Sequence, residues 1–71
     1  MKITDEQKKL LQNTKLMDGT NAWEFVQSKS EADQPWLIAG ILSCMKKGYN
    51  LHESEICWET RNLRYAQSPT Y

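Results

Sequence analysis

The chain has 71 residues, 39% of them hydrophobic, and its nine basic and nine acidic residues give a formal net charge of zero. This is the composition of a folded domain, and it argues against intrinsic disorder. Nucleic-acid-binding proteins usually carry a basic excess, because neutralising phosphates supplies much of their affinity, so the balanced charge argues against that class. The length predicts a single small domain over 1–71 with a modest core and marginal stability.

The N-terminal segment is expected to form a helix over about 5–17. Thr4 and Gln7 have the spacing of a capping box, in which two side chains satisfy backbone groups at the helix start. One face of the expected helix carries Leu10, Leu11, Thr14 and Met17. Gly19 is suited to end it, because glycine readily adopts the left-handed conformation of a helix cap.

A second capping-box spacing, Asn21 with Glu24, predicts a short helix over about 22–29. The polar stretch SKSEADQ then connects it to the next element. That element begins either with Ser30 and Asp33 as its cap or with Pro35 in its first turn, where a missing N–H costs nothing.

Residues 35–48, PWLIAGILSCMKKG, are the most informative stretch, because about ten of them are apolar with no polar stripe. A helix that is apolar all round is buried all round or spans a membrane, and a span needs about 20 apolar residues. We therefore expect the central core helix of the domain, ending at Gly48, and no membrane span. Gly40 lowers helix propensity, so its position predicts the close approach of another helix.

The segment 51–67 has two interpretations. Asn50 with Glu53 is a third capping-box spacing, Ser54 is a second candidate start, and strong helix formers follow, which favours a helix. A β-hairpin turning at Arg61–Asn62 would instead use the alternating apolar residues Ile56, Trp58, Leu63 and Tyr65.

The expected fold class is therefore mainly α, a compact bundle of three to four short helices, with the C-terminal β-hairpin as the alternative to the last helix. Pro69 stops a helix, so residues 68–71 are expected to form an irregular tail.

No group of residues indicates an enzyme or a metal site. Cys44, His52 and Cys57 are only three candidate ligands, whereas structural zinc sites use four in close pairs, so we expect no metal and no cofactor. Cys44 falls in the apolar helix and is expected to be a core thiol. The acidic residues Glu53, Glu55 and Glu59 are interpreted as a solvated face rather than a catalytic site. We expect no catalytic residue.

Seven aromatic rings are many for so small an interior, and Trp and Tyr dominate interface hot spots. The C-terminal segment brings aromatic and arginine residues together, and we expect partner contact through Trp58, Arg61, Arg64 and Tyr65. The preferred function is a small non-enzymatic regulatory protein that binds or inhibits a larger protein partner, or associates with itself. The N-terminal sequence MKITDEQKKLL has no apolar stretch of the secretory type, so the expected compartment is the cytoplasm.

The alternative is a compact DNA-binding transcriptional regulator. A helix-turn-helix would place its turn at residues 61–63, and a winged element would span 56–67. The phosphate contacts would come from Lys46, Lys47, Arg61 and Arg64. The small size and the tryptophan content are also similar to those of small regulators of phages and mobile elements, although no residue pattern carries that likeness.

Overall fold

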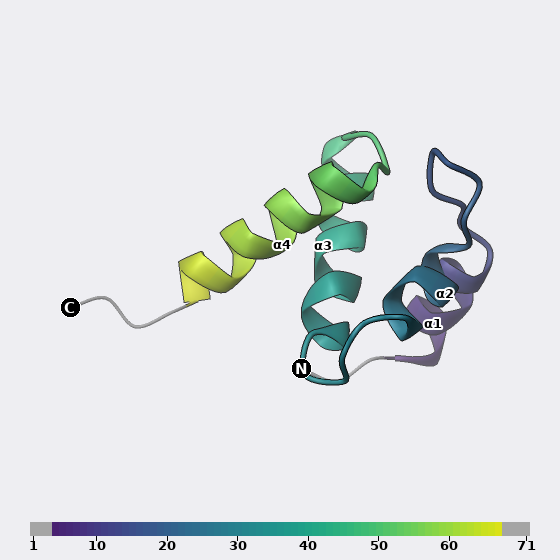
Figure 1. Cartoon of the computed structure of the whole chain (residues 1–71), viewed down its shortest axis with the longest axis horizontal. Helices are drawn as coiled ribbons and strands as arrows, with labels where there is room; N and C mark the ends of the chain where they lie inside the picture. The colour runs from purple at the N-terminus through teal and green to yellow at the C-terminus, as the bar shows by residue number, and fades with distance from the viewer. Residues whose placement is uncertain (1–3, 68–71) are drawn as a thin grey trace.

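The computed structural model describes residues 4–67, and within them the chain forms four α-helices and no strand (Figure 1). The helices are α1 (Asp5–Gln12), α2 (Ala22–Gln27), α3 (Gln34–Lys47) and α4 (Glu53–Gln67). The mainly helical fold class is confirmed. The tail expected at residues 68–71 lies outside the described residues.

The helix α3 is the centre of the arrangement. The helices α1 and α2 lie together on one side of it, and α4 crosses its other side, as Figure 1 shows. The C-terminal half of α4 extends away from the other helices. One side of α4 is therefore packed only along part of its length.

The first helix has the predicted capping box but ends earlier than expected. The Thr4 hydroxyl accepts a hydrogen bond from the Gln7 backbone at 3.1 Å, and the Thr4 N–H donates to the Gln7 side chain at 3.2 Å. The prediction of a helix to residue 17 is wrong, because α1 ends at Gln12. The Asn21 side chain donates to the Gln12 carbonyl at 2.7 Å and so occupies an acceptor at the helix end. The chain then turns through Gly19, whose φ is 89°.

The second helix begins as predicted and is shorter at its end. The Asn21 side-chain oxygen accepts hydrogen bonds from the backbone of Trp23 at 3.0 Å and of Glu24 at 3.2 Å, which is the expected N-cap. Helix α2 ends at Gln27 rather than at residue 29. Its apolar side, Ala22, Phe25 and Val26, is buried in the core.

The prediction of a central core helix is confirmed by α3. Its buried residues are Leu37, Ile38, Gly40, Ile41 and Cys44. Asp33 is at the N-cap without a side-chain capping bond, although the Ser30 hydroxyl donates to its carboxylate at 2.9 Å. Gly48 ends the helix in the left-handed conformation at φ 76°, as expected.

The segment 53–67 is one continuous helix, so the hairpin alternative is wrong, and so are the turn at 61–63 and the winged element at 56–67. Ile56, Glu59 and Thr60 are buried together, and their spacing of three and four places them on one helix face. In a strand, Ile56 and Trp58 would face the same side, whereas Ile56 is buried and Trp58 is exposed. The residue that caps the start of α4 also differs from the predicted ones. The His52 Nδ1 accepts a hydrogen bond from the backbone N–H of Ser54 at 3.1 Å.

The helices α3 and α4 approach closely at Gly40, which confirms the role predicted for this glycine. A Cβ atom at Gly40 would collide with the Thr60 hydroxyl and would lie 3.3 Å from the Ile56 carbonyl oxygen. The Thr60 hydroxyl donates to that same carbonyl at 2.6 Å, so it is satisfied within α4. A larger residue than glycine would push the two helices apart.

Replacing Ile41 by alanine should largely unfold the domain. Ile41 is fully buried, and large-to-small changes at such sites cost about 2–5 kcal/mol, a large part of what a small domain has. Urea unfolding followed by circular dichroism measures the loss. The matched control is Leu42→Ala on the same helix, where the side chain is only partly buried and the loss should be smaller. Equal losses at the two positions would contradict the assignment of the core.

Gly40→Ala should destabilise the protein, although alanine is the better helix former. In the middle of a helix, Gly→Ala raises stability by about 1 kcal/mol through helix propensity. Here the new methyl group would collide with Thr60, and such overpacking lowers stability by about 1–3 kcal/mol, so we expect a net loss of stability. The loss should shrink in a Thr60→Ala background, because the nearest atom is then removed. A stabilising Gly40→Ala would show that α3 and α4 are not in this close contact.

Candidate interaction surface on α4

The outer side of α4 carries two large aromatic side chains that the fold does not bury. Trp58 is 55% exposed and Tyr65 is 80% exposed. Residues seven apart on a helix lie on the same side, and Arg61 lies between the two along that side. Three of the four residues predicted for partner contact therefore share one solvent-facing stripe, which we call the outer face of α4.

Arg64, the fourth predicted contact residue, lies at the edge of this face and is tied to the start of α3. Its guanidinium donates to the Asp33 carboxylate at 3.1 Å and lies 5.5 Å from the centroid of the Trp36 ring. The carboxylate and the ring together hold the Arg64 side chain against the α3 end of the molecule. Arg64 thus joins the outer face to the rest of the fold.

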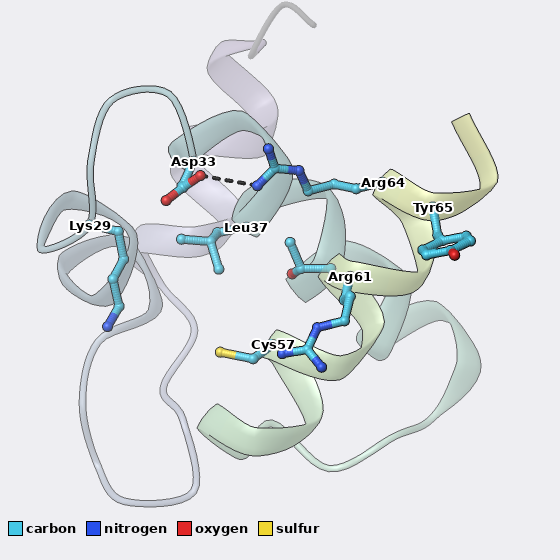
Figure 2. A pocket seen from close by; sticks show the side chains of 8 residues that line it. Lys29, Asp33, Leu37, Cys57, Arg61, Arg64 and Tyr65 are labelled. Carbon is cyan, nitrogen blue, oxygen red and sulfur yellow. Dashed lines mark hydrogen bonds and ion pairs between the residues drawn. The ribbon is translucent and has the colours of Figure 1, made fainter. Parts of the chain in front are cut away.

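A groove of about 530 Å³ runs along this edge of α4 (Figure 2). It is lined by Lys29, Asp33, Leu37, Cys57, Thr60, Arg61, Arg64 and Tyr65. Cys57 and Arg61, one helical turn apart on α4, both line it, and the Cys57 thiol is exposed (Figure 2). Lys29 also forms a longer ion pair with Glu53 at 3.6 Å. The groove therefore combines apolar walls with three cations and one carboxylate.

A second hollow, of about 650 Å³, lies beside Trp58. It is lined by Tyr49, Ser54, Glu55 and Trp58. The Tyr49 and Trp58 ring centroids are 6.3 Å apart, with the ring planes tilted by 57°. This pairing of Tyr49 with Trp58 was not predicted from the sequence. No local pattern reveals that pairing, because it depends on the turn between α3 and α4.

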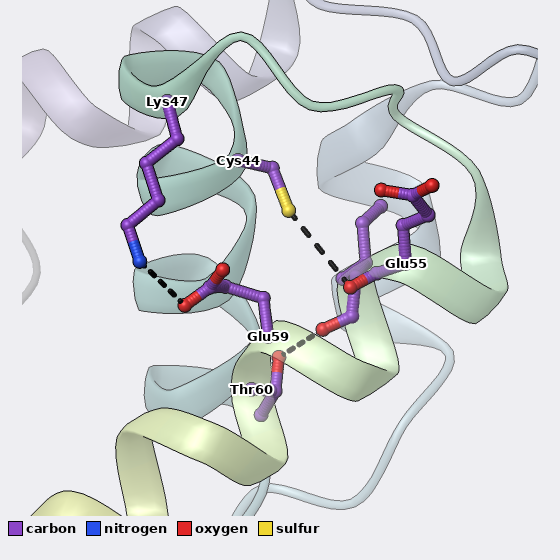
Figure 3. Close-up of polar contacts among 6 residues, drawn as sticks. Cys44, Lys47, Glu55, Glu59 and Thr60 are labelled. Atoms are coloured by element: carbon purple, nitrogen blue, oxygen red, sulfur yellow. Dashed lines mark hydrogen bonds and ion pairs between the residues drawn. The ribbon is translucent and has the colours of Figure 1, made fainter.

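Glu59 is buried rather than solvated, which corrects the interpretation of the acidic residues as one exposed face. Glu59 is 2% exposed, and its Oε1 pairs with the Lys47 ammonium at 3.2 Å (Figure 3). The other carboxylate oxygen, Oε2, is buried and accepts no hydrogen bond in the described part of the chain. Lys47 is one of the four residues proposed for phosphate contact, and its charge is therefore already paired with a carboxylate of the protein itself.

The buried thiol of Cys44 lies beside this pair, as Figure 3 shows. Its Sγ is 3.9 Å from the Glu55 carbonyl oxygen. Burial raises the pKa of the Cys44 thiol, and the nearby carboxylates of Glu59 and Glu55 raise it further. Cys44 is fully buried in the hydrophobic core, which confirms the core role predicted for it.

The three residues considered for a metal lie in different surroundings. Cys44 is buried, Cys57 is exposed, and the His52 Nδ1 caps α4. Across residues 4–67, no group of three His, Cys, Asp or Glu side chains could hold a metal ion. None of the helices in this range has the length and apolar character needed to cross a membrane.

Comparison with known proteins adds no family to this picture. No protein-family model, no curated protein and no solved structure matches the chain.

The two cysteines should differ sharply in reactivity. Ellman's reagent should modify Cys57 rapidly in the folded protein, because its thiol is exposed, and should reach buried Cys44 only when the domain unfolds. One thiol should titrate in buffer and two in concentrated urea. Cys57→Ser should remove the fast phase and leave the urea-dependent one. Rapid reaction of both thiols in buffer would contradict the placement of Cys44.

Proposed function

We propose that this chain is a small non-enzymatic protein that regulates a larger protein by binding it through the outer face of α4. The contact residues are Trp58, Arg61 and Tyr65, with Arg64 at the edge. One observation carries the proposal, namely that α4 buries one side against α3 and leaves Trp58 and Tyr65 exposed on the other.

The chemistry of this face is that of an interface. Trp and Tyr supply large apolar areas with few rotatable bonds, and each keeps one polar group for a hydrogen bond at the rim. Arg61 is exposed and forms no hydrogen bond or ion pair within residues 4–67, so its donors are available to a partner. Arginine is enriched beside such aromatic anchors in protein interfaces.

The protein would regulate its partner by covering part of the partner's surface with α4. The C-terminal half of α4 extends from the other helices (Figure 1), so it can lie in a groove of a larger protein while α1 and α2 stay outside. A reducing, cytoplasmic setting is part of the proposal, because both cysteines are free thiols and Cys57 is exposed. A second copy of the chain is a competing occupant of the same face.

DNA binding remains the competing function, with Lys46, Lys47, Arg61 and Arg64 as its candidate residues. Two of these cations are already paired with carboxylates, Lys47 with Glu59 and Arg64 with Asp33. The overall charge is balanced. These observations favour a protein partner over phosphate groups.

Trp58→Ala combined with Tyr65→Ala should remove partner binding while the protein stays folded. Both side chains are largely exposed, so the melting temperature should move little, whereas loss of two anchors should weaken binding at least about tenfold. The measurement is quantitative mass spectrometry of proteins retained from a lysate of the source cells by immobilised wild type and variant. Leu10→Ala, a partly exposed apolar residue on α1, is the matched control.

Proteins retained by wild type and by Leu10→Ala, but lost with the double variant, would support the proposal. An identical set of retained proteins for all three would contradict it. Light scattering of the pure protein tests the second copy as occupant, because a dimer that the double variant dissociates would replace the larger partner. A mobility shift of duplex DNA that weakens steeply with salt would favour the DNA-binding alternative instead.

A further inference from the structure

The hollow beside Trp58 has two aromatic walls and one acidic wall. Tyr49 and Trp58 face it with rings tilted by 57°, and Ser54 and Glu55 complete the lining. Tyr49 is 39% exposed and Trp58 is 55% exposed, so both rings reach solvent. Glu55 comes from the same helix as Trp58, in the first turn of α4.

Among the described residues, Glu55 differs from the other acidic residues of α4 in having no partner for its charge. Glu53 pairs with Lys29, and Glu59 pairs with Lys47. The Glu55 carboxylate forms no ion pair or hydrogen bond within residues 4–67. The hollow therefore carries one uncompensated negative charge beside two aromatic rings.

A cation already lies over one of these rings. The Lys47 ammonium lies 5.8 Å from the Tyr49 ring centroid, while its charge is balanced by Glu59. Aromatic faces attract cations through their negative quadrupole, and tryptophan does so most strongly. The Trp58 ring has no cation of this kind within the described residues.

We propose that this hollow accepts an arginine side chain of the protein partner, which rests on the proposed function and specifies the chemistry of that partner. The guanidinium plane stacks on Trp58, and its N–H groups donate to the Glu55 carboxylate. Arginine fits better than lysine, because its planar group can stack and form two parallel hydrogen bonds to a carboxylate at the same time. The partner surface then presents a positively charged arginine side chain to the N-terminal half of α4.

The test uses the isolated protein and a small probe, so it does not depend on finding the partner. N-acetyl-arginine amide is titrated into labelled protein, and the indole N–H signal of Trp58 is followed by nuclear magnetic resonance. Its assignment comes from the signal missing in Trp58→Ala. N-acetyl-citrulline amide, nearly the same shape without the charge, is the matched probe control.

We expect a saturable shift of the Trp58 signal with the arginine probe and a much smaller one with the citrulline probe. Glu55→Gln should weaken the arginine probe about threefold to fivefold, the size of an exposed charge pair. Glu24→Gln, in α2, should leave it unchanged. Circular dichroism verifies that both variants are folded.

Equal shifts with the two probes, no saturable shift at Trp58, or an unchanged affinity in Glu55→Gln would overturn the arginine site. The proposed function can then be judged separately by partner capture with Glu55→Gln. If capture depends on Trp58 and Tyr65 but not on Glu55, the proposed interface on α4 is supported and the arginine site at Glu55 is rejected.

Discussion

The backbone of α4 lies directly on α3 where Gly40 faces Thr60. This contact fixes which side of α4 is covered, because Thr60 and Ile56 belong to the side that meets α3. The Glu59–Lys47 pair lies next to it and adds a polar constraint on the rotation of α4. Glu59 is buried in this pair while the Lys47 side chain is half exposed, and a buried carboxylate is costly to leave without its partner, so the pair favours one register over its neighbours. The exposed position of Trp58 follows from that register.

The fully buried part of α4 is confined to its first half, since Ile56, Glu59 and Thr60 are its buried residues among those described. From Arg61 to Ala66 the side chains are exposed, apart from partly buried Leu63. Arg64 secures this second half through Asp33 and Trp36 rather than through apolar burial. A partner that covers the outer face would add apolar burial where the domain itself supplies little. The core-facing side of α4 and the proposed interaction surface are thus separate sides of one helix.

Local signals predicted much of this fold because they act within a few residues. The Thr4 and Asn21 caps, the Gly48 end and the apolar core helix all depend on nearest neighbours along the chain. The end of α1 was not predictable in the same way, because the Asn21 side chain that occupies the Gln12 carbonyl comes from the next element. The hairpin alternative arose because Ile56 and Trp58 alternate as a strand would, and only packing against α3 separates the two interpretations.

For similar reasons, the sequence indicates the composition of the candidate surface but not its full geometry. An aromatic and arginine-rich helix segment can be seen in the sequence, but the burial of Glu59 and the pairing of Tyr49 with Trp58 require the crossing of α3 and α4. The measurement that tests this account most directly is the set of nuclear Overhauser contacts in solution. We predict contacts between the Gly40 α-protons and the Thr60 side chain, together with sequential amide contacts throughout 53–67. Absence of the Gly40–Thr60 contacts, or cross-strand contacts between residues 58 and 65, would contradict it.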